Sequence, residues 1–181
     1  MGTNGILRWC KIKQKESLFL DCSLLLFIYA GRVSFSFLPN VQPMTTILII
    51  ITLSLGLSAG LIVALLSLVV SNLSLGFGVW TIAQLIAYTA VLLVVYPFRR
   101  IYNNIPLVVM AFVSGFTGLL YGFIISLVQA PFFGWLSFFP YYISGIPYDI
   151  AHAVGNFVFY LLLAPIFFPI IHKQINKFYL S

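Results

Sequence analysis

The sequence predicts an all-α membrane protein, a bundle of six transmembrane helices, and its composition and hydropathy pattern carry that prediction. Of the 181 residues, 62% are hydrophobic and 7% are charged, whereas a soluble domain carries roughly a quarter charged residues. Long apolar runs alternate with short polar segments along the chain, as expected for helices that cross a bilayer. This composition excludes a disordered chain, a soluble α/β enzyme and a nucleic-acid-binding protein.

The cations determine the predicted topology. The chain has nine Lys and Arg residues, and all except Arg32 flank the apolar runs, where the positive-inside rule places the cytoplasm. These flanking residues are Arg8, Lys11, Lys13, Lys15, Arg99, Arg100, Lys173 and Lys177. Both termini are therefore expected in the cytoplasm: residues 1–17 form an N-terminal segment, residues 18–172 the transmembrane domain and residues 173–181 a C-terminal tail.

The first helix is predicted over residues 18–38. The next apolar run, residues 43–75, is too long for a single crossing of a bilayer core of about 30 Å. An even number of helices must separate the N-terminal cations from Arg99 and Arg100 if both groups lie in the cytoplasm. The run is therefore divided into two short helices that reverse direction at residues 56–60, where two glycines permit a tight turn.

Three further helices, over residues 79–96, 105–128 and 146–171, complete the bundle. The outer connections would be residues 39–42, 76–78 and 129–145. The last of these is rich in aromatic residues, which could form either a belt at the membrane surface or a hydrophobic lid over a cavity. These residues are Phe132, Phe133, Trp135, Phe138, Phe139, Tyr141 and Tyr142.

Because charges are scarce, each polar side chain at membrane depth requires an explanation. Asp149, His152 and Asn156 follow at i, i+3 and i+7, so they share one face of the last helix. Two interpretations stay open. Asp149 could stabilise the N-terminal end of this helix while His152 and Asn156 bond to neighbouring helices, or the three side chains could form a ligand-binding face.

Further polar residues lie toward the same predicted side of the membrane. Trp80, Gln84 and Tyr88 form one stripe at i, i+4 and i+8, which suits either helix packing or ligand contact. Their convergence with the last helix predicts an outward-facing polar cavity. The other residues on this side are Asn40, Gln42, Asn72, Tyr141 and Tyr142.

Arg32 is the cation outside the cytoplasmic clusters, in the outer half of the first helix. An isolated charge there would be costly, so Arg32 is expected either to form a buried ion pair with Asp149 or to extend to the outer surface. Small residues on the first and fifth helices allow either close helix packing or docking of a partner membrane protein. They are Ala30, Gly31, Ser34, Gly115, Gly118 and Gly122.

Two short patterns could suggest catalysis, but the predicted topology separates them. Residues 56–60 fit G-x-S-x-G around Ser58, and His152 with Asn156 fits H-x-x-x-N. Ser58 would lie at the cytoplasmic turn and His152 near the outside, too far apart for a nucleophile and its base. The sequence has no phosphate-binding loop and no H-E-x-x-H motif. We therefore expect no enzyme activity, metal site or cofactor in this chain.

Several of these residues resemble the motifs of a known family. They are the P-N-V-Q-P segment at residues 39–43, Ser71 with Asn72, Trp80 with Thr81 and Gln84, and the G-I-P-Y-D-x-x-H-A-x-G-N pattern over residues 145–156. Together they resemble the S component, the substrate-binding membrane subunit, of energy-coupling factor (ECF) vitamin transporters, and most of all its cobalamin-specific group. The resemblance extends from about Ala30 to the C-terminus.

The resemblance implies a six-helix subunit of the bacterial cell membrane that captures cobalamin or a related corrinoid outside the cell and topples in the bilayer to release it inside. Another vitamin, such as pantothenate or a queuosine precursor, is the alternative ligand. A membrane coupling subunit and two ATPase subunits would be the partners, and the ATPases alone would bind ATP and Mg²⁺. An intramembrane hydrolase or a structural scaffold is the alternative of another class.

The resemblance also implies where this chain binds its partners. The family's small-residue docking pattern on the first helix corresponds to Ala30 and Ser34, with Ser23 nearer the cytoplasm. The predicted substrate-binding residues are Asn40, Gln42, Asn72, Trp80, Gln84, Tyr88, Tyr141, Tyr142, Asp149, His152 and Asn156.

Overall fold

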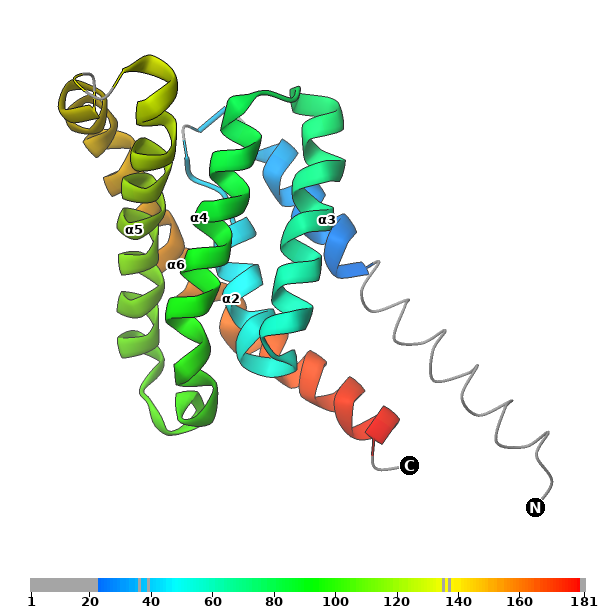
Figure 1. Cartoon of the computed structure of the whole chain (residues 1–181). Coiled ribbons are helices and arrows are strands. Elements are labelled where there is room, and N and C mark those ends of the chain that lie inside the picture. The colour runs from blue at the N-terminus through cyan, green and yellow to red at the C-terminus, as the bar shows by residue number, and fades with distance from the viewer. Residues whose placement is uncertain (1–22, 36, 39, 135, 137, 180–181) are drawn as a thin grey trace.

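The computed structural model describes residues 23–179 except residues 36, 39, 135 and 137. All regular structure in this part of the chain is helical, which confirms the all-α prediction (Figure 1). The α-helices are Ser23–Ser34, α2 (Met44–Leu55), α3 (Leu57–Leu75), α4 (Val79–Val95), α5 (Leu107–Phe133) and α6 (Phe138–Tyr179), and two 3₁₀ helices, η1 (Tyr96–Arg100) and η2 (Tyr102–Asn104), follow α4.

Four helical stretches are long and apolar enough to cross a membrane, and two more are apolar but shorter. The long stretches are Leu57–Leu75, Val79–Arg100, Leu107–Phe132 and Phe138–Asn176, and the short ones are Ser23–Ser34 and Met44–Leu55. These helices are compatible with a membrane protein. The number of crossings and the side of each terminus stay predictions, and residues 18–22 of the predicted first helix lie outside the described residues.

The short helix α2 occupies the centre of the bundle. Its first ten residues, 44–53, are all buried, and it contacts α3, α4, α5 and α6. A helix that is apolar on every side is stable only when other helices surround it. The connection that precedes α2 descends into the bundle before the helix begins (Figure 1). At about 1.5 Å per residue, α2 is much shorter than the bilayer core, and the space beyond its N-terminal end is available to other groups.

The predicted division of residues 43–75 into two helices is confirmed, but the two glycines have different roles. Gly56 alone separates α2 from α3, with φ 108° and ψ 171°. Gly60 lies inside α3, where a Cβ would overlap Thr52 Oγ1 of α2. The first glycine therefore makes the turn, and the second allows the two helices to approach closely.

We expect Gly56→Ala to lower the free energy of unfolding by about 1–3 kcal/mol, because this backbone conformation is essentially restricted to glycine. The new Cβ would also lie 3.4 Å from Nη1 of Arg99. Thermal unfolding of the purified protein in detergent measures the effect. Gly145→Ala is the matched control, since no atom lies within 4 Å of its added Cβ and its φ is not positive. Equal melting temperatures for the two variants would contradict this account of the turn.

The aromatic segment over residues 129–145, predicted as a loop, is mostly helical, and that prediction was wrong. Helix α5 continues to Phe133, and α6 begins at Phe138. Apolar and aromatic residues are as common in buried or membrane helices as in loops at the membrane surface. The composition of this segment therefore could not distinguish a helix from a loop. The chain reverses between the end of α5 and the start of α6, and Gly134, directly after α5, has φ 90°.

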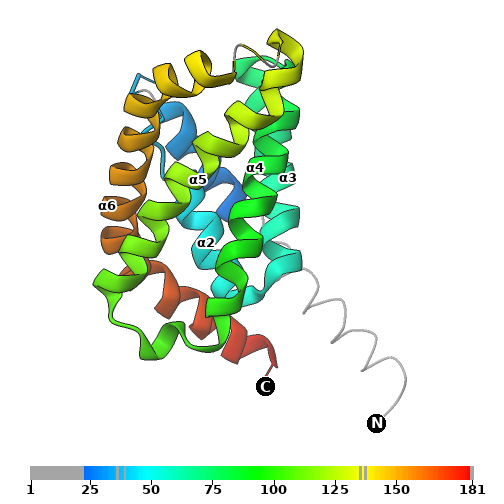
Figure 2. The ribbon, with the colours of Figure 1, turned by 60° about the vertical axis from the view of Figure 1, so that its left-hand side comes forward.

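Helix α6 is not a straight rod. It contains Pro147, Pro165 and Pro169, and proline inside a helix removes a backbone hydrogen bond and bends the axis. Its first turns lie across one end of the bundle, its middle descends beside α5, and its last turns cross the opposite end (Figure 2). Because of the first bend, the aromatic start of α6 lies across the end of the bundle instead of continuing along α5.

Three glycines on α5 allow α6 to pack closely against it, because a side chain at these positions would lie too close to α6. A Cβ on Gly118 would lie 2.7 Å from the backbone N of Ala153, and a Cβ on Gly122 would overlap the carboxylate of Asp149. A Cβ on Gly115 would lie 3.2 Å from the carbonyl oxygen of Ala153. Of the two interpretations of the small residues, helix packing therefore accounts for those on α5. On the first helix, Gly31 packs against Pro43.

Candidate functional site

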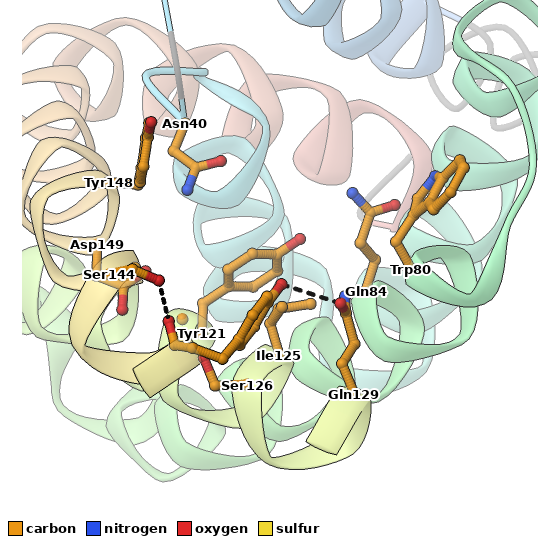
Figure 3. Close-up of a pocket in the computed structure, with 13 residues that line it drawn as sticks. Asn40, Trp80, Gln84, Tyr121, Ile125, Ser126, Gln129, Ser144, Tyr148 and Asp149 are labelled. Carbon is orange, nitrogen blue, oxygen red and sulfur yellow. Dashed lines mark hydrogen bonds between the residues drawn. The ribbon is translucent and has the colours of Figure 1, made fainter. Parts of the chain in front are cut away.

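A cavity of about 440 Å³ opens at the end of the bundle where α4 begins and α5 ends (Figure 3). The connection before α2, the first turns of α4, the last turns of α5 and the start of α6 all contribute to its wall. The lining residues are Asn40, Trp80, Gln84, Tyr121, Gly122, Ile125, Ser126, Gln129, Tyr141, Ser144, Gly145, Tyr148 and Asp149.

Five predicted site residues line this cavity, namely Asn40, Trp80, Gln84, Tyr141 and Asp149. The α5 side of the wall was missed by the sequence analysis. Tyr121, Ile125 and Gln129 recur at i, i+4 and i+8 and so share one helical face. Helical periodicity would have found this face if residues 129–133 had been assigned to a helix.

Asp149 is the only acidic side chain among the described residues. It is 8% exposed, and its carboxylate lies over Gly122 at the cavity wall. Within the described part of the chain it takes part in no hydrogen bond or ion pair. A buried carboxylate without a partner is costly, so Asp149 is available for a hydrogen-bond donor or a positive charge that enters the cavity.

Arg32 lies behind the cavity rather than at the outer surface. It is 5% exposed; its Nη1 donates to Ser71 Oγ at 2.7 Å, and its Nη2 donates to Gln84 Oε1 at 3.5 Å. Asp149 is not among its partners in the described residues. Arg32 thus reaches the cavity through Gln84, and its charge stays inside the protein without a neighbouring carboxylate in this part of the chain.

His152 lies behind the cavity wall and positions two groups that line it. Its Nδ1 donates to the backbone carbonyl of Asn40 at 2.7 Å, and its Nε2 lies 3.1 Å from Thr45 Oγ1. The imidazole also stacks on Tyr121, with ring centroids 5.0 Å apart. Asn40 has φ 58°, a conformation that asparagine tolerates better than most residues, and the bond from His152 stabilises it.

Five other predicted site residues also lie outside the lining. The rings of Tyr88 and Tyr121 pack in a tilted arrangement with centroids 4.8 Å apart, and Asn72 Nδ2 donates to Thr81 Oγ1 at 3.0 Å, which joins α3 to α4. Asn156 is fully buried, and its side-chain amide has no partner within the described residues. The remaining two are Gln42 and Tyr142.

The start of α6 partly covers the cavity. Tyr141 Oη donates to Gln129 Oε1 at 3.0 Å, and Ser144 Oγ donates to the carbonyl of Tyr141 at 2.8 Å (Figure 3). Tyr142 packs on Phe123 of α5, with ring centroids 5.6 Å apart. Of the seven aromatic residues in this segment, Tyr141 is the one among the described lining residues, while Phe132 and Phe139 are exposed, so the lid and the membrane-surface belt both stay predictions.

The chemistry of the cavity is that of binding through hydrogen bonds and aromatic faces. It presents three side-chain amides, three phenols, two serine hydroxyls, the indole of Trp80 and the carboxylate of Asp149. Within the described residues, no group of three His, Cys, Asp or Glu side chains is placed to hold a metal ion.

The fold and the cavity define an all-α protein with membrane-length apolar helices and a ligand-sized cavity at one end of the bundle. A scan against protein-family models, a search of curated proteins and a search of solved structures found no match to this chain.

Proposed function

We propose that this chain is the substrate-capture subunit of an ECF-type vitamin importer in the bacterial cell membrane. The observation that carries the proposal is Asp149, a buried carboxylate that lines a cavity and lacks a protein partner in the described residues. Ionisable groups at membrane depth are rare and usually functional. The motifs that resemble the S-component family include Asn40, Trp80, Gln84 and Asp149, and all four line this cavity.

The size of the cavity favours a small vitamin over cobalamin. Cavities of about 300–1,000 Å³ enclose drug-sized ligands, and this cavity has about 440 Å³. Cobalamin is much larger, so its binding would require the lid at the start of α6 to move outward. A compact polar molecule such as pantothenate or a queuosine precursor would fit with the lid in place. We therefore propose a small ligand with several hydrogen-bonding groups, at least one of them a donor to Asp149.

The first helix offers the proposed docking surface for the coupling subunit. Ala30 and Ser34 are exposed, as are Leu26 and Val33 near them, so this surface is available to lipid or to another membrane protein. Small residues let a partner helix approach closely in a bilayer. Import would then depend on partner ATPases, because this chain has no phosphate-binding loop of its own.

The experiment is radioligand binding to the detergent-purified protein, alone and co-expressed with coupling and ATPase subunits. Cobalamin, pantothenate and a queuosine precursor are tested in parallel. Saturable binding of one compound and co-purification of the coupling subunit would support the proposal. Binding of cobalamin alone would overturn the preference for a small ligand. A protein that binds no vitamin and retains no coupling subunit would instead favour a structural scaffold, and loss of function in Ser58→Ala would favour a hydrolase.

A further inference from the structure

A second pocket, of about 650 Å³, lies at the opposite end of α4 from the ligand cavity. Trp80 and Gln84, in the first turns of α4, line the ligand cavity, whereas η1 and η2, after the last turn, form the second pocket together with the end of α2. Its polar lining comes from Ser54, Tyr96, Arg99, Arg100, Tyr102 and Asn103. The two pockets are therefore separate sites at opposite ends of the bundle.

The second pocket has two positive charges and no acid among the described residues. Arg99 and Arg100 both line it, and neither forms an ion pair in the part of the chain that the structure describes. The acidic residue in that part, Asp149, lies at the other cavity. Glu16 and Asp21 lie outside the described residues. Two arginines that line one pocket without a carboxylate among the described residues favour an anion from outside the bundle.

The neighbouring groups suit an oxyanion. Ser54 Oγ is buried beside the Tyr102 phenol, and Asn103 adds an amide to the lining. Tyr102 shares a hydrogen bond with His172 Nε2 at 2.9 Å. Burial raises the pKa of the Tyr102 phenol, so this side chain stays neutral at physiological pH and does not repel a negative ligand.

The turn at Gly56 helps to position one of the two cations. The guanidinium of Arg99 lies against Gly56, since a Cβ there would be 3.4 Å from Nη1 and 3.5 Å from Cζ. Arg99 thus packs over the junction of α2 and α3, at the level where the helices end. Exposed apolar side chains, Leu93, Val94 and Ile101, flank this level. In the predicted membrane orientation, this level would lie among the phosphate headgroups, with acyl chains beside the adjoining helix surface.

We propose that the pocket formed by Ser54, Arg99, Arg100 and Asn103 binds a phosphate group, carried by an anionic phospholipid headgroup or by a free phosphate compound. Two arginines recognise phosphate oxygens through bidentate hydrogen bonds, and the hydroxyl and amide satisfy the remaining oxygens. Basic pockets between membrane helices are known to suit anionic lipid headgroups. The proposed phosphate site and the proposed vitamin site lie at opposite ends of the bundle. An experiment can therefore refute either one without bearing on the other.

The test measures ligand-dependent thermal stabilisation of the full chain in a neutral detergent and lipid retention by native mass spectrometry. The probes are phosphatidylglycerol, phosphatidylcholine and inorganic phosphate. Arg99→Gln is compared with Lys173→Gln, a control that removes one positive charge from an exposed position outside the pocket. Arg100→Gln is a second pocket variant, useful if loss of the Arg99 contact with Gly56 impairs folding.

We expect phosphatidylglycerol to stabilise the wild type and Lys173→Gln alike, and to bind about tenfold more weakly to either pocket variant. Stabilisation by inorganic phosphate alone, with the same dependence on Arg99 and Arg100, would assign the site to a free phosphate compound. Equal losses in Arg99→Gln and Lys173→Gln would show general charge attraction and overturn the proposal. Equal retention of phosphatidylcholine, or binding of no probe, would also overturn it.

Discussion

Gly118→Ala is expected to lower the free energy of unfolding by about 1–3 kcal/mol, the usual cost of an added methyl group in a packed interior. The new Cβ would lie 2.7 Å from the backbone N and 2.8 Å from Cα of Ala153. No side-chain rotation can relieve a contact with backbone atoms, so α5 and α6 would have to separate. The loss outweighs the gain in helix propensity from glycine to alanine, about 1 kcal/mol.

Thermal unfolding in detergent measures this change, and Gly115→Ala provides a graded comparison. Its added Cβ would meet the carbonyl of the same Ala153 at 3.2 Å, so we expect a smaller loss. If Gly118→Ala proved as stable as the wild type, the close packing of α5 against α6 would be wrong. The position of Asp149 over Gly122 would then lose its basis as well.

Asp149→Asn is expected to weaken ligand binding at least tenfold, about 1.4 kcal/mol, while leaving the empty protein as stable as the wild type or more stable. The carboxylate is buried without a partner in the described residues, so replacing it with a neutral amide removes a desolvation cost. Opposite effects on binding and on stability are typical of functional sites. Radioligand binding and thermal unfolding of the empty protein measure the two effects.

Gly122→Ala tests the same carboxylate without changing it. Its Cβ would overlap Asp149, so the side chain must move and binding should fall to a similar extent. Asn156→Leu is the matched control, because its buried amide has no partner among the described residues and lies outside the cavity lining; we expect it to preserve binding. If Asp149→Asn destabilised the empty protein and left binding intact, Asp149 would instead stabilise the end of its helix.

Local sequence signals predicted most of the helical architecture. Apolar runs bounded by cations or glycines located the helices, and the excess length of residues 43–75 required the break that Gly56 provides. Both signals depend on residues near one another in the chain, because helix length and backbone freedom are local properties. The polar end of the bundle was also predictable, since Asp149 and Gln84 are exceptions in otherwise apolar helices.

The composition of the cavity wall depended on the tertiary structure. Periodicity places residues on one helix face but does not say which faces meet. Asn72 and Asn156 therefore appeared equivalent to Asn40 in the sequence, yet only Asn40 lines the cavity. The α5 residues Tyr121 and Gln129 were missed because their segment was divided between a helix and a predicted loop.

The sequence by itself determined an all-α chain with membrane-length apolar helices, the break at Gly56 and the shortage of charge that makes each ionisable group significant. Only the tertiary structure decided that Arg32 bonds to Ser71 and Gln84, that Asp149 lies over Gly122, and that Ser54 shares a pocket with Arg99. Charge and burial energies depend on distances of a few ångströms between residues far apart in the chain. Those distances arise only when the helices pack.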